Sequence, residues 1–380
     1  MPGAKGPVII YGGSFDPPHR GHMALAAAAL RQLRPSAFYF VPGFRTPFKD
    51  FRPVPYSARA AMLAAAVMDS GMAGAVRISP FEARQRRVVY SFETVSHFRK
   101  LHPGVRVYFL MGSDCLAGFG GWRRGKEILR DAVLLVGRRP GSPIPRGAPP
   151  HKLLSGRFPE ADSTAIRNSL FLGRGHRQLS RGVTELAEKR ALYLFRERSM
   201  LRRLLTSRRY EHTILSAELA LELAPLAGVP QQKAALAALL HDCARDLPAG
   251  KRAALCPADT PLRAEMLREA PVLAHAWAGA ELARRKFGIE DPEVLDAIRV
   301  HATGAPGMGP LARLLYVSDF ANRGRDFREA RLVRRLAFID LDEAFRSANY
   351  VKLVYTFSGG GWVHPLSVGL WNSLQEKKSG

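Results

Sequence analysis

The chain has 380 residues, of which 47% are hydrophobic and 24% charged, and this ordinary globular composition excludes a mostly disordered chain. No apolar run approaches the roughly 18–20 residues that a membrane span needs, and the N-terminus lacks the apolar core of a secretory signal. Three cysteines, far apart and in no metal-like spacing, predict no disulfide framework and favour a reducing cytoplasm. The net charge of +24 is uneven, since residues 1–200 carry +19, so we expect two electrostatically different domains and an attraction to polyanions.

The first half of the chain alternates short apolar runs with Ala/Leu-rich segments of helical character. Strands are expected at 8–11, 37–41, 75–78, 105–111 and 132–136, and helices at 23–33 and 57–69. This alternation predicts an α/β fold with a doubly wound parallel sheet that is covered by helices on both faces. The charged stretch 82–87 is expected to be a solvated face. Ligands bind at the C-terminal ends of the strands in such a sheet, so the loop after the first strand is the first candidate site.

That loop has an unusual composition. It reads Gly12-Gly13-Ser14-Phe15-Asp16-Pro17-Pro18-His19-Arg20-Gly21-His22. Glycines let backbone N–H groups approach a phosphate closely, and the N-terminus of the following helix adds partial positive charge. His19 and His22 are three positions apart at the start of that helix, so they can face the same point. A glycine turn with two incidental histidines is the alternative, but the HxGH pattern between a strand and a helix favours a phosphate site.

This loop resembles the HxGH motif of the nucleotidyltransferases, and most closely that of the bacterial nicotinate-nucleotide adenylyltransferases. Their second signature, SSTxIR, is matched by residues 162–167, with Asp162 in place of the first serine. Further matches are Gly112-Ser113-Asp114 with Trp122, Val136–Pro140, Tyr90–Thr94 and Phe48-Lys49, where Phe48 replaces a histidine of the family. The resemblance covers about residues 6–197 and implies a Rossmann-like nucleotidyltransferase domain over residues 1–198.

The resemblance implies a reaction in which the phosphate of nicotinate mononucleotide attacks the α-phosphorus of ATP and pyrophosphate leaves. Such chemistry needs in-line positioning and neutralisation of phosphate charge, with Mg²⁺ bound to the ATP. The catalytic residues implied are His19, His22, Lys49 and Arg167, with Lys49 and Arg167 covering the triphosphate. The substrate-binding residues implied are Gly12, Gly13, Ser14, Phe15, Gly112, Asp114, Trp122, Arg139, Ser163 and Thr164. Trp122 would stack on the pyridine ring, unless it is a core tryptophan, and Asp162 would be tolerated beside phosphate if it caps a helix.

From residue 201 onward the strand patterns disappear. Helices are expected at 214–223, 231–242, 272–287, 292–301 and 309–320. The segment 196–209 is basic and compatible with a helix, so it predicts a semi-rigid joint in place of a flexible linker. We therefore expect a second, all-α domain over residues 199–380.

The helical half carries six candidate metal ligands in an ordered set. They are His212, His241, Asp242, His275, His301 and Asp319. Any one of these histidines could be structural, but imidazoles and carboxylates in this number suit a divalent transition metal. The set resembles the H…HD…D core of HD-domain phosphohydrolases. Its two additional histidines imply a binuclear site, for which we expect iron first and manganese or zinc as alternatives.

The resemblance narrows to the bacterial HD hydrolases that split diadenosine tetraphosphate symmetrically, over about residues 199–374. The matching segments are Arg209–Thr213, Ala238–Asp242, His301–Gly304 and His364-Pro365. The resemblance implies that a metal-activated water attacks a phosphorus atom and yields two ADP, with Asp242 bridging the metals. Arg245, which stands where the family has Lys, and Arg325 would contact phosphates unless they are solvated surface residues. Asn322 replaces a Glu of the family, which predicts weaker support of a metal ligand.

Two classes of function remain open at this stage. The first is a bifunctional enzyme acting on ATP, nicotinate mononucleotide and diadenosine tetraphosphate, with nicotinamide mononucleotide as an alternative acceptor. The second is a nucleic-acid-binding regulator whose HD domain is a non-catalytic metal-bound scaffold, which the charge of the first half favours. The paired HxGH and STxIR motifs favour the enzyme, so nucleic acid and membrane partners are not expected, and the oligomeric state is left open.

Overall fold

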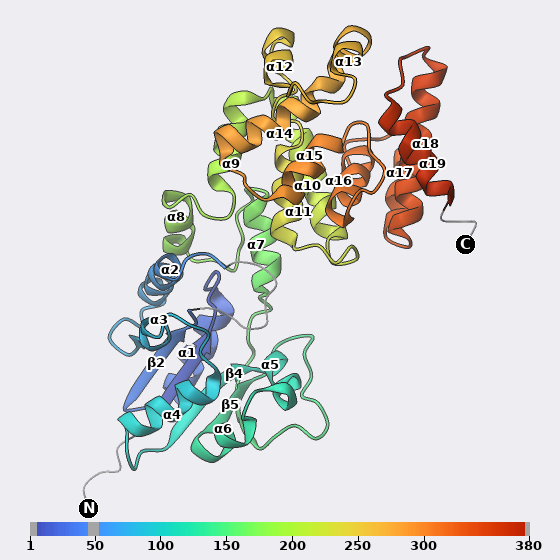
Figure 1. Cartoon of the computed structure of the whole chain (residues 1–380). Coiled ribbons are helices and arrows are strands. Elements are labelled where there is room, and N and C mark those ends of the chain that lie inside the picture. The colour runs from blue at the N-terminus through green and yellow to red at the C-terminus, as the bar shows by residue number, and fades with distance from the viewer. Residues whose placement is uncertain (1–5, 45–52, 377–380) are drawn as a thin grey trace, which may run out of the picture. The chain divides into compact units, whose positions relative to one another are not determined.

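The computed structural model of the chain describes residues 6–44 and 53–376. Phe48 and Lys49 lie outside these residues. The chain divides into two compact units (Figure 1). The N-terminal unit contains the residues up to Leu170 together with Arg174–Tyr193, and the helical unit contains Phe171–Gly173 together with the residues from Leu194 onward.

The N-terminal unit is built on a six-stranded sheet in which every pair of neighbouring strands is parallel. Its strands are β1 (Val8–Gly13), β2 (Ala37–Pro42), β3 (Arg77–Ile78), β4 (Val107–Gly112), β5 (Val133–Gly137) and β6 (His151–Leu154). The order is β3-β2-β1-β4-β5-β6, so the direction of winding reverses between β1 and β4. Open sheets bind ligands at this switch point, at the carboxyl ends of the strands. The loop after β1 therefore lies where a ligand site is expected.

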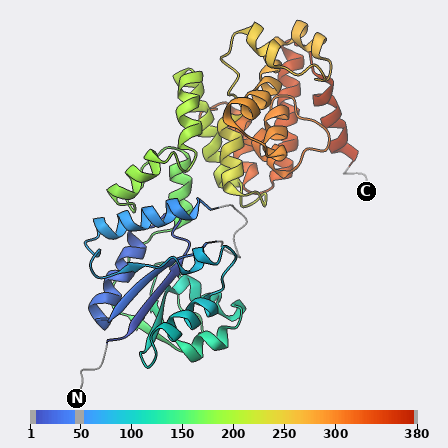
Figure 2. The same ribbon diagram turned by 60° about the vertical axis from the view of Figure 1, so that its left-hand side comes forward.

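Helices surround this sheet (Figures 1 and 2). They are α1 (Arg20–Leu33), α2 (Tyr56–Asp69), α3 (Phe81–Arg84), α4 (Ser91–Leu101), α5 (Ser113–Ala117), α6 (Gly125–Asp131), α7 (Ser163–Phe171) and α8 (Arg181–Lys189). Residues of β4 are buried throughout, as a sheet covered on both faces requires. Side chains of β1 and β4, such as Ile10 and Phe109, pack with Phe98 of α4 in one core. The predicted doubly wound α/β fold is confirmed.

The helical unit contains no strand among its described residues. Its helices are α9 (Phe195–Leu204), α10 (Ser207–Leu223), α11 (Gln231–Leu240), α12 (Ala249–Leu255), α13 (Arg263–Glu269), α14 (Ala274–Phe287), α15 (Pro292–Val300), α16 (Pro310–Ala321), α17 (Arg328–Ala337), α18 (Leu341–Ser358) and α19 (Pro365–Glu376). Helices α10, α11, α15 and α16 pack against one another and form its centre. No described helix of either unit has the length and hydropathy to cross a bilayer. The predicted all-α second domain is confirmed.

Four local features differ from the sequence-based expectation. Strand β3 is only two residues long, and the edge strand β6 was not predicted because its central side chains, Lys152 and Leu153, are exposed and form no apolar run. The basic segment 196–209 is interrupted at Thr206, whose N–H donates to Asp246 Oδ2 at 2.8 Å. The expected division at 198/199 falls inside α9, where Leu201 is fully buried in the helical unit.

Candidate functional site

The HxGH loop brings its two histidines together at the start of α1. The rings of His19 and His22 stack with centroids 3.6 Å apart, and the main-chain N–H of His19 donates to His22 Nδ1 at 3.2 Å. His19 Nε2 lies 3.1 Å from Ser163 Oγ, which belongs to the second motif. Side chains from two segments that are 144 residues apart therefore lie together at the switch point of the sheet, where they can donate hydrogen bonds to a ligand.

The environment of His19 keeps its imidazole neutral. Burial lowers its pKa to about 3, and the Arg139 guanidinium acts in the same direction. The side chain is only 2% exposed, and its Nδ1 has no hydrogen-bond partner among the described residues. A neutral ring has one N–H to donate, so His19 can bind an anionic oxygen without accepting its proton.

The second motif begins α7. Asp162 Oδ2 accepts a hydrogen bond from the Ala165 N–H at 2.7 Å, which is the geometry of a helix N-cap. The carboxylate that replaces a serine of the family is thus neutralised in part by the helix N-terminus. Thr164 Oγ1 accepts from Arg167 at 3.1 Å, and Ser163 Oγ lies 3.1 Å from His19 Nε2.

Arg167 lies next to the HxGH loop, and its role in covering the triphosphate stays a prediction. Its side chain is 7% exposed, and it donates to the carbonyl of Asp16 at 2.8 Å. Asp16 Oδ1 accepts in turn from the Tyr193 hydroxyl at 2.7 Å. Arg167 therefore holds the HxGH loop through the Asp16 carbonyl, because a buried guanidinium needs hydrogen-bond acceptors.

A second buried arginine, which the sequence analysis missed, supports the same loop. Arg59 is 1% exposed and donates to the carbonyls of Ser14 at 2.5 Å, Gly43 at 2.6 Å and Val54 at 2.8 Å. It lies on α2 in an Ala-rich segment, where only its burial distinguishes it from a surface arginine. Arg59 therefore fixes the loops after β1 and β2 relative to each other.

A pocket of about 210 Å³ opens beside the HxGH loop. Gly12, Gly13, Ser14 and Trp122 line it, as expected, together with Tyr90 and Ser91 of a further matching segment. Trp122 meets Phe109 edge to face, with centroids 6.1 Å apart, and so forms an aromatic wall of the pocket. Phe15 is not among the lining residues described, since it is 1% exposed and packs against Tyr11, Phe40 and His22.

The wall of this pocket also contains Glu82, which corrects the expectation of a solvated face for residues 82–87. Arg84–Arg87 are exposed, but Glu82 is 8% exposed and accepts from Thr94 Oγ1 at 2.8 Å. Burial raises the pKa of Glu82 to about 7, although the hydrogen bond from Thr94 opposes this effect. No local pattern marks Glu82, because its burial depends on the packing of α3 against β2.

The segments after β4 and β5 join at the carboxyl edge of the sheet. The Arg139 guanidinium forms an ion pair with Asp114 Oδ2 at 2.6 Å, and the main-chain N–H of Arg139 donates to Ser113 Oγ at 2.9 Å. A Cβ at Gly112 would lie 2.7 Å from Arg139 Cδ, so a larger residue there would displace the Arg139 side chain from its present position. Gly112, Asp114 and Arg139 thus form one structural group.

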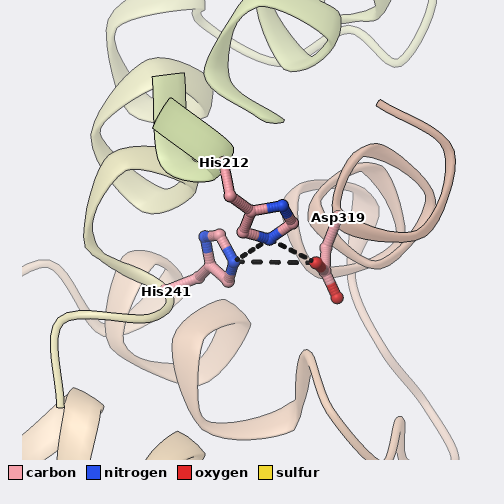
Figure 3. A group of neighbouring side chains, drawn as sticks. All are labelled: His212, His241 and Asp319. Atoms are coloured by element: carbon pink, nitrogen blue, oxygen red, sulfur yellow. Dashed lines mark hydrogen bonds and ion pairs between the residues drawn. The ribbon is translucent and has the colours of Figure 1, made fainter. Parts of the chain in front are cut away.

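The six predicted metal ligands converge in the helical unit. Figure 3 shows three of them, in which His212 Nε2 lies 3.0 Å from Asp319 Oδ1 and 3.3 Å from His241 Nε2. A second group is His241, Asp242 and His301. Asp242 Oδ1 is 3.2 Å from His275 Nε2, and Asp242 Oδ2 is 3.7 Å from His241 Nε2. The two oxygens of Asp242 therefore face the two halves of the cluster.

The ring orientations of the histidines fit a metal site. Hydrogen bonds join the Nδ1 of His241, His275 and His301 to main-chain carbonyls three residues earlier. If Nδ1 carries the proton, each Nε2 presents a lone pair to the cluster, as a metal-binding histidine must. Two atoms that each lie about 2.1 Å from one ion are roughly 3–3.5 Å apart, which is close to the separations observed. The donor set fits one or two divalent cations.

Charge in the cluster agrees with this assignment. Burial lowers the pKa of His241 to about 3 and that of His275 to about 4, so both are neutral ligands near pH 7. Burial alone would raise the pKa of Asp242 and Asp319, but contacts with neighbouring imidazoles, and for Asp319 also the charge of Lys352, hold both well below the usual value. Neutral imidazoles and ionised carboxylates are the protonation states that a metal requires.

Comparison with known proteins finds a separate family for each unit. The Cytidylyltransferase-like family model matches residues 10–169, and the HD domain model matches residues 209–335. An Exiguobacterium sibiricum protein named probable nicotinate-nucleotide adenylyltransferase is 32% identical over 48% of this chain and 97% of its own length. A Bacillus subtilis protein named symmetrical bis(5'-nucleosyl)-tetraphosphatase is 38% identical over 45% of this chain and 91% of its own length. The chain therefore belongs to the Cytidylyltransferase-like family through its N-terminal unit and to the HD-domain family through its helical unit.

One relative joins both parts in one chain. A Mycoplasma genitalium protein named probable nicotinate-nucleotide adenylyltransferase/Ap4A hydrolase is 26% identical over 83% of this chain and 87% of its own length. The resemblances stated from the sequence are thereby confirmed.

Within the tetraphosphatase-like unit, several cations surround the ligand cluster. Arg209, which the sequence analysis quoted in a motif without assigning it a role, donates to Asp242 Oδ2 at 2.8 Å. Arg325 lies 3.7 Å from Asp319 Oδ1, and with Arg209 it lines a pocket of about 520 Å³ beside His212. Arg245 lies against the ring of His275, 2.9 Å from its Nδ1. Lys352, which no sequence pattern marked, is half-buried beside Asp319, and desolvation lowers its pKa to about 8.

Asn322 occupies the position where this hydrolase family has a Glu. It is fully buried, its Oδ1 accepts from the Gly324 N–H at 3.0 Å and its Nδ2 donates to the Asp319 carbonyl at 2.9 Å. These two bonds orient the amide so that Nδ2 faces His212 Nδ1 at 3.4 Å. An NH₂ group cannot accept a hydrogen bond from His212 Nδ1. His212 therefore lacks the carbonyl acceptor that the Nδ1 atoms of the other three cluster histidines have.

Proposed function

We propose that the chain transfers the adenylyl group of ATP to nicotinate mononucleotide, and that its helical unit hydrolyses diadenosine tetraphosphate to two ADP. The observation that carries the proposal is the presence in one chain of two complete constellations. One is the His19–His22–Ser163 group at the switch point of the sheet, and the other is the pair of candidate metal groups with His275 beside Asp242 and His301. A binding module needs neither arrangement, so both sites favour catalysis.

For adenylyl transfer, the N-terminal unit must hold phosphates in line and stabilise the charge that develops on them. His19 and His22 donate to phosphate oxygens from the start of α1, and Ser163 and Thr164 donate from the start of α7. The pocket lined by Trp122 receives the pyridine ring, and Mg²⁺ accompanies ATP. We infer nicotinate in preference to nicotinamide from the relatives.

For hydrolysis, the helical unit holds the cations through His212, His241, Asp242, His275, His301 and Asp319. We propose two ions with Asp242 between them, iron in first place and manganese or zinc as alternatives. A bound divalent metal supplies an acidified water and positive charge at the phosphates. Arg209 and Arg325 orient the polyphosphate chain, whereas Arg245, packed on His275, orients a ligand of the cluster. We place the protein in the cytoplasm, where its nucleotide substrates are found.

A product assay on the intact protein tests both halves of the proposal. With ATP and Mg²⁺, it should convert nicotinate mononucleotide to the dinucleotide faster than nicotinamide mononucleotide. With diadenosine tetraphosphate and Fe²⁺, Mn²⁺ or Zn²⁺, it should release only ADP. Release of AMP and ATP would contradict symmetrical hydrolysis, and equal rates on both mononucleotides would contradict the choice of acceptor.

A further inference from the structure

Tyr193 is the last residue of the N-terminal unit, and its side chain is buried in that unit. The residue is 6% exposed, and its hydroxyl donates to Asp16 Oδ1 at 2.7 Å. Asp16 belongs to the HxGH loop and lies 177 residues earlier in the chain. No sequence motif contains Tyr193, so the sequence analysis gave it no role. The end of the unit is thus connected directly to the loop of the proposed transfer site.

The backbone around Tyr193 adopts a conformation that residues other than glycine rarely take. The φ angle is +52° at Ala191, +52° at Tyr193 and +62° at Leu194. In this left-handed region the Cβ of an L-residue crowds the following carbonyl oxygen. Residues persist in such conformations only where the surrounding structure holds them, and they gather at functional sites. This turn delivers the Tyr193 hydroxyl to Asp16, which gives the unusual backbone a purpose.

Helix α8 anchors the chain shortly before Tyr193. This helix packs against α2, and its residues Val183 and Ala187 are buried. The main-chain N–H of Gly182 donates to Asp69 Oδ2 of α2 at 2.8 Å. A helix that is fixed to the rest of the unit therefore precedes the turn, so the position of the Tyr193 hydroxyl is well defined.

The Asp16 side chain is at the centre of a buried polar group. It is 1% exposed, and its Oδ2 accepts from the Val54 N–H at 3.3 Å while its Oδ1 accepts from Tyr193. Burial lowers the pKa of Arg59 and of Arg167, and the charge of Asp16 opposes this effect in both. Both arginines also donate to main-chain carbonyls of the HxGH loop. Tyr193 thus completes the group that holds this loop.

The placement of Asp16 determines the placement of His19. Only Pro17 and Pro18 separate the two residues, and proline rings fix φ near –65°, so this short segment has little freedom. A displacement of Asp16 is therefore passed on to His19 and to its 3.1 Å contact with Ser163. Groups that stabilise a transition state must be held to within a fraction of an ångström, because small misplacements lower the rate strongly.

We propose that Tyr193 is a positioning residue for adenylyl transfer. Its hydroxyl holds the Asp16 carboxylate, and Asp16 in turn holds His19 in the orientation from which it donates to a phosphate oxygen. Tyr193 itself contacts no substrate. The proposal rests on the proposed transfer function and names a residue outside both sequence motifs on which the rate of that reaction depends.

The kinetics of Tyr193→Phe in the intact protein test this role. The variant keeps the buried ring and removes the hydroxyl, so kcat for nicotinate mononucleotide should fall about tenfold while KM for both substrates stays within about twofold. Tyr39→Phe is the matched control, because Tyr39 is 7% exposed and its hydroxyl lies 3.1 Å from His102 Nε2, outside the HxGH loop. It should retain the wild-type kcat. Unchanged kcat in Tyr193→Phe, or an equal fall in Tyr39→Phe, would overturn the proposal.

A double variant separates positioning of His19 from a general effect on the fold. If Tyr193 acts through His19, Tyr193→Phe should not lower the residual transfer rate of His19→Asn any further, since effects of coupled residues are not additive. A purely structural role would instead give the same tenfold loss in both backgrounds, and that result would contradict the proposal.

NMR of intact protein with isotope-labelled histidine measures the position of His19 without reference to activity. His19→Asn identifies the His19 ring signals, which should move in Tyr193→Phe and stay in place in Tyr39→Phe. If the signals move but the wild type transfers adenylyl groups to neither mononucleotide, the positioning role stands and the proposed function fails. If transfer proceeds and neither kcat nor the signals change in Tyr193→Phe, the positioning role fails and the proposed function stands.

Discussion

The Nε2 atoms of His275 and His301 lie 3.0 Å apart, although the Nδ1 of each ring is hydrogen-bonded to a carbonyl. Two neutral imidazoles that both donate from Nδ1 would point lone pairs at each other. Such a contact is favourable only if a cation or an additional proton lies between the two atoms. The cluster therefore couples metal binding to the stability of the helical unit.

Removal of metal should accordingly destabilise the helical unit selectively. A ligand present at about 100 times its Kd stabilises the folded state by roughly 2.7 kcal/mol, and a chelator removes this contribution. Calorimetry of the intact protein should show one transition that moves to lower temperature with chelator and returns with added Fe²⁺ or Mn²⁺. A transition unaffected by chelator would mean that the cluster is held together without a metal.

Asp242→Ala should halve or abolish the metal content of the protein. The Asp242 carboxylate faces both halves of the cluster, and water cannot replace it without loss of affinity. Metal analysis after gel filtration measures the effect. Asp296→Ala, at an exposed position of α15, is the matched control and should bind the normal amount. Normal stoichiometry in Asp242→Ala would assign that residue to packing alone.

His22→Ala should abolish adenylyl transfer while diadenosine tetraphosphate hydrolysis continues. Loss of one donor to a developing charge lowers the rate by about 10²–10³-fold. His151→Ala is the control, because His151 lies on β6 outside both constellations. Near-normal transfer by His22→Ala would exclude this motif from the mechanism.

The sequence alone predicted those contacts that depend on a short spacing in the chain or on a motif. His19 and His22 are neighbours because they are three residues apart at a helix start, and the six metal ligands were each identifiable by type and order. Strands β1, β2, β4 and β5 were visible as apolar runs, because parallel strands in the middle of a sheet are buried on both faces.

The remaining residues depend on tertiary packing that has no local signature. Arg59 and Glu82 resemble surface residues in the sequence, yet both are buried at the HxGH pocket. Arg167 was expected to cover the triphosphate, but its hydrogen bond to the Asp16 carbonyl, 151 residues away in the chain, could not be predicted from the sequence. Lys352 reaches the cluster only because α18 packs on α16. Burial and long-range partners are the two quantities that the sequence alone does not contain.

The stability of the N-terminal unit should fall as the pH drops below about 6.5, in part because of His19. Burial lowers the pKa of His19 to about 3 in the folded state, whereas the unfolded chain titrates near 6.5. Below pH 6.5 His19 binds a proton in the unfolded state but not in the folded state. The contribution of neutral His19 to the free energy of unfolding is therefore complete above that pH and is lost progressively toward pH 3. Urea unfolding of the wild type and His19→Asn between pH 7.5 and 4.5 measures this. The variant should show a shallower pH dependence, and identical slopes would contradict the burial of a neutral His19.

Fusion of the two activities should reduce the release of diadenosine tetraphosphate. Adenylyl transfer to ATP itself would produce this compound as a by-product, and the helical unit would remove it. The first 200 residues carry a net charge of +19, which retains polyanions near the protein at low salt. A tether raises the effective concentration of one site for the product of another, provided that the geometry allows transfer.

Complementary full-length variants test this coupling without cutting the chain. Intact protein is compared with an equimolar mixture of His22→Ala and Asp242→Ala, adjusted to contain the same number of each active site. At nanomolar enzyme, intact protein should release less free diadenosine tetraphosphate than the mixture, and added salt should narrow the difference because it screens the retention of polyanions. Equal release in both samples would show that the two sites act independently, and absence of the by-product from both would remove the premise of coupling.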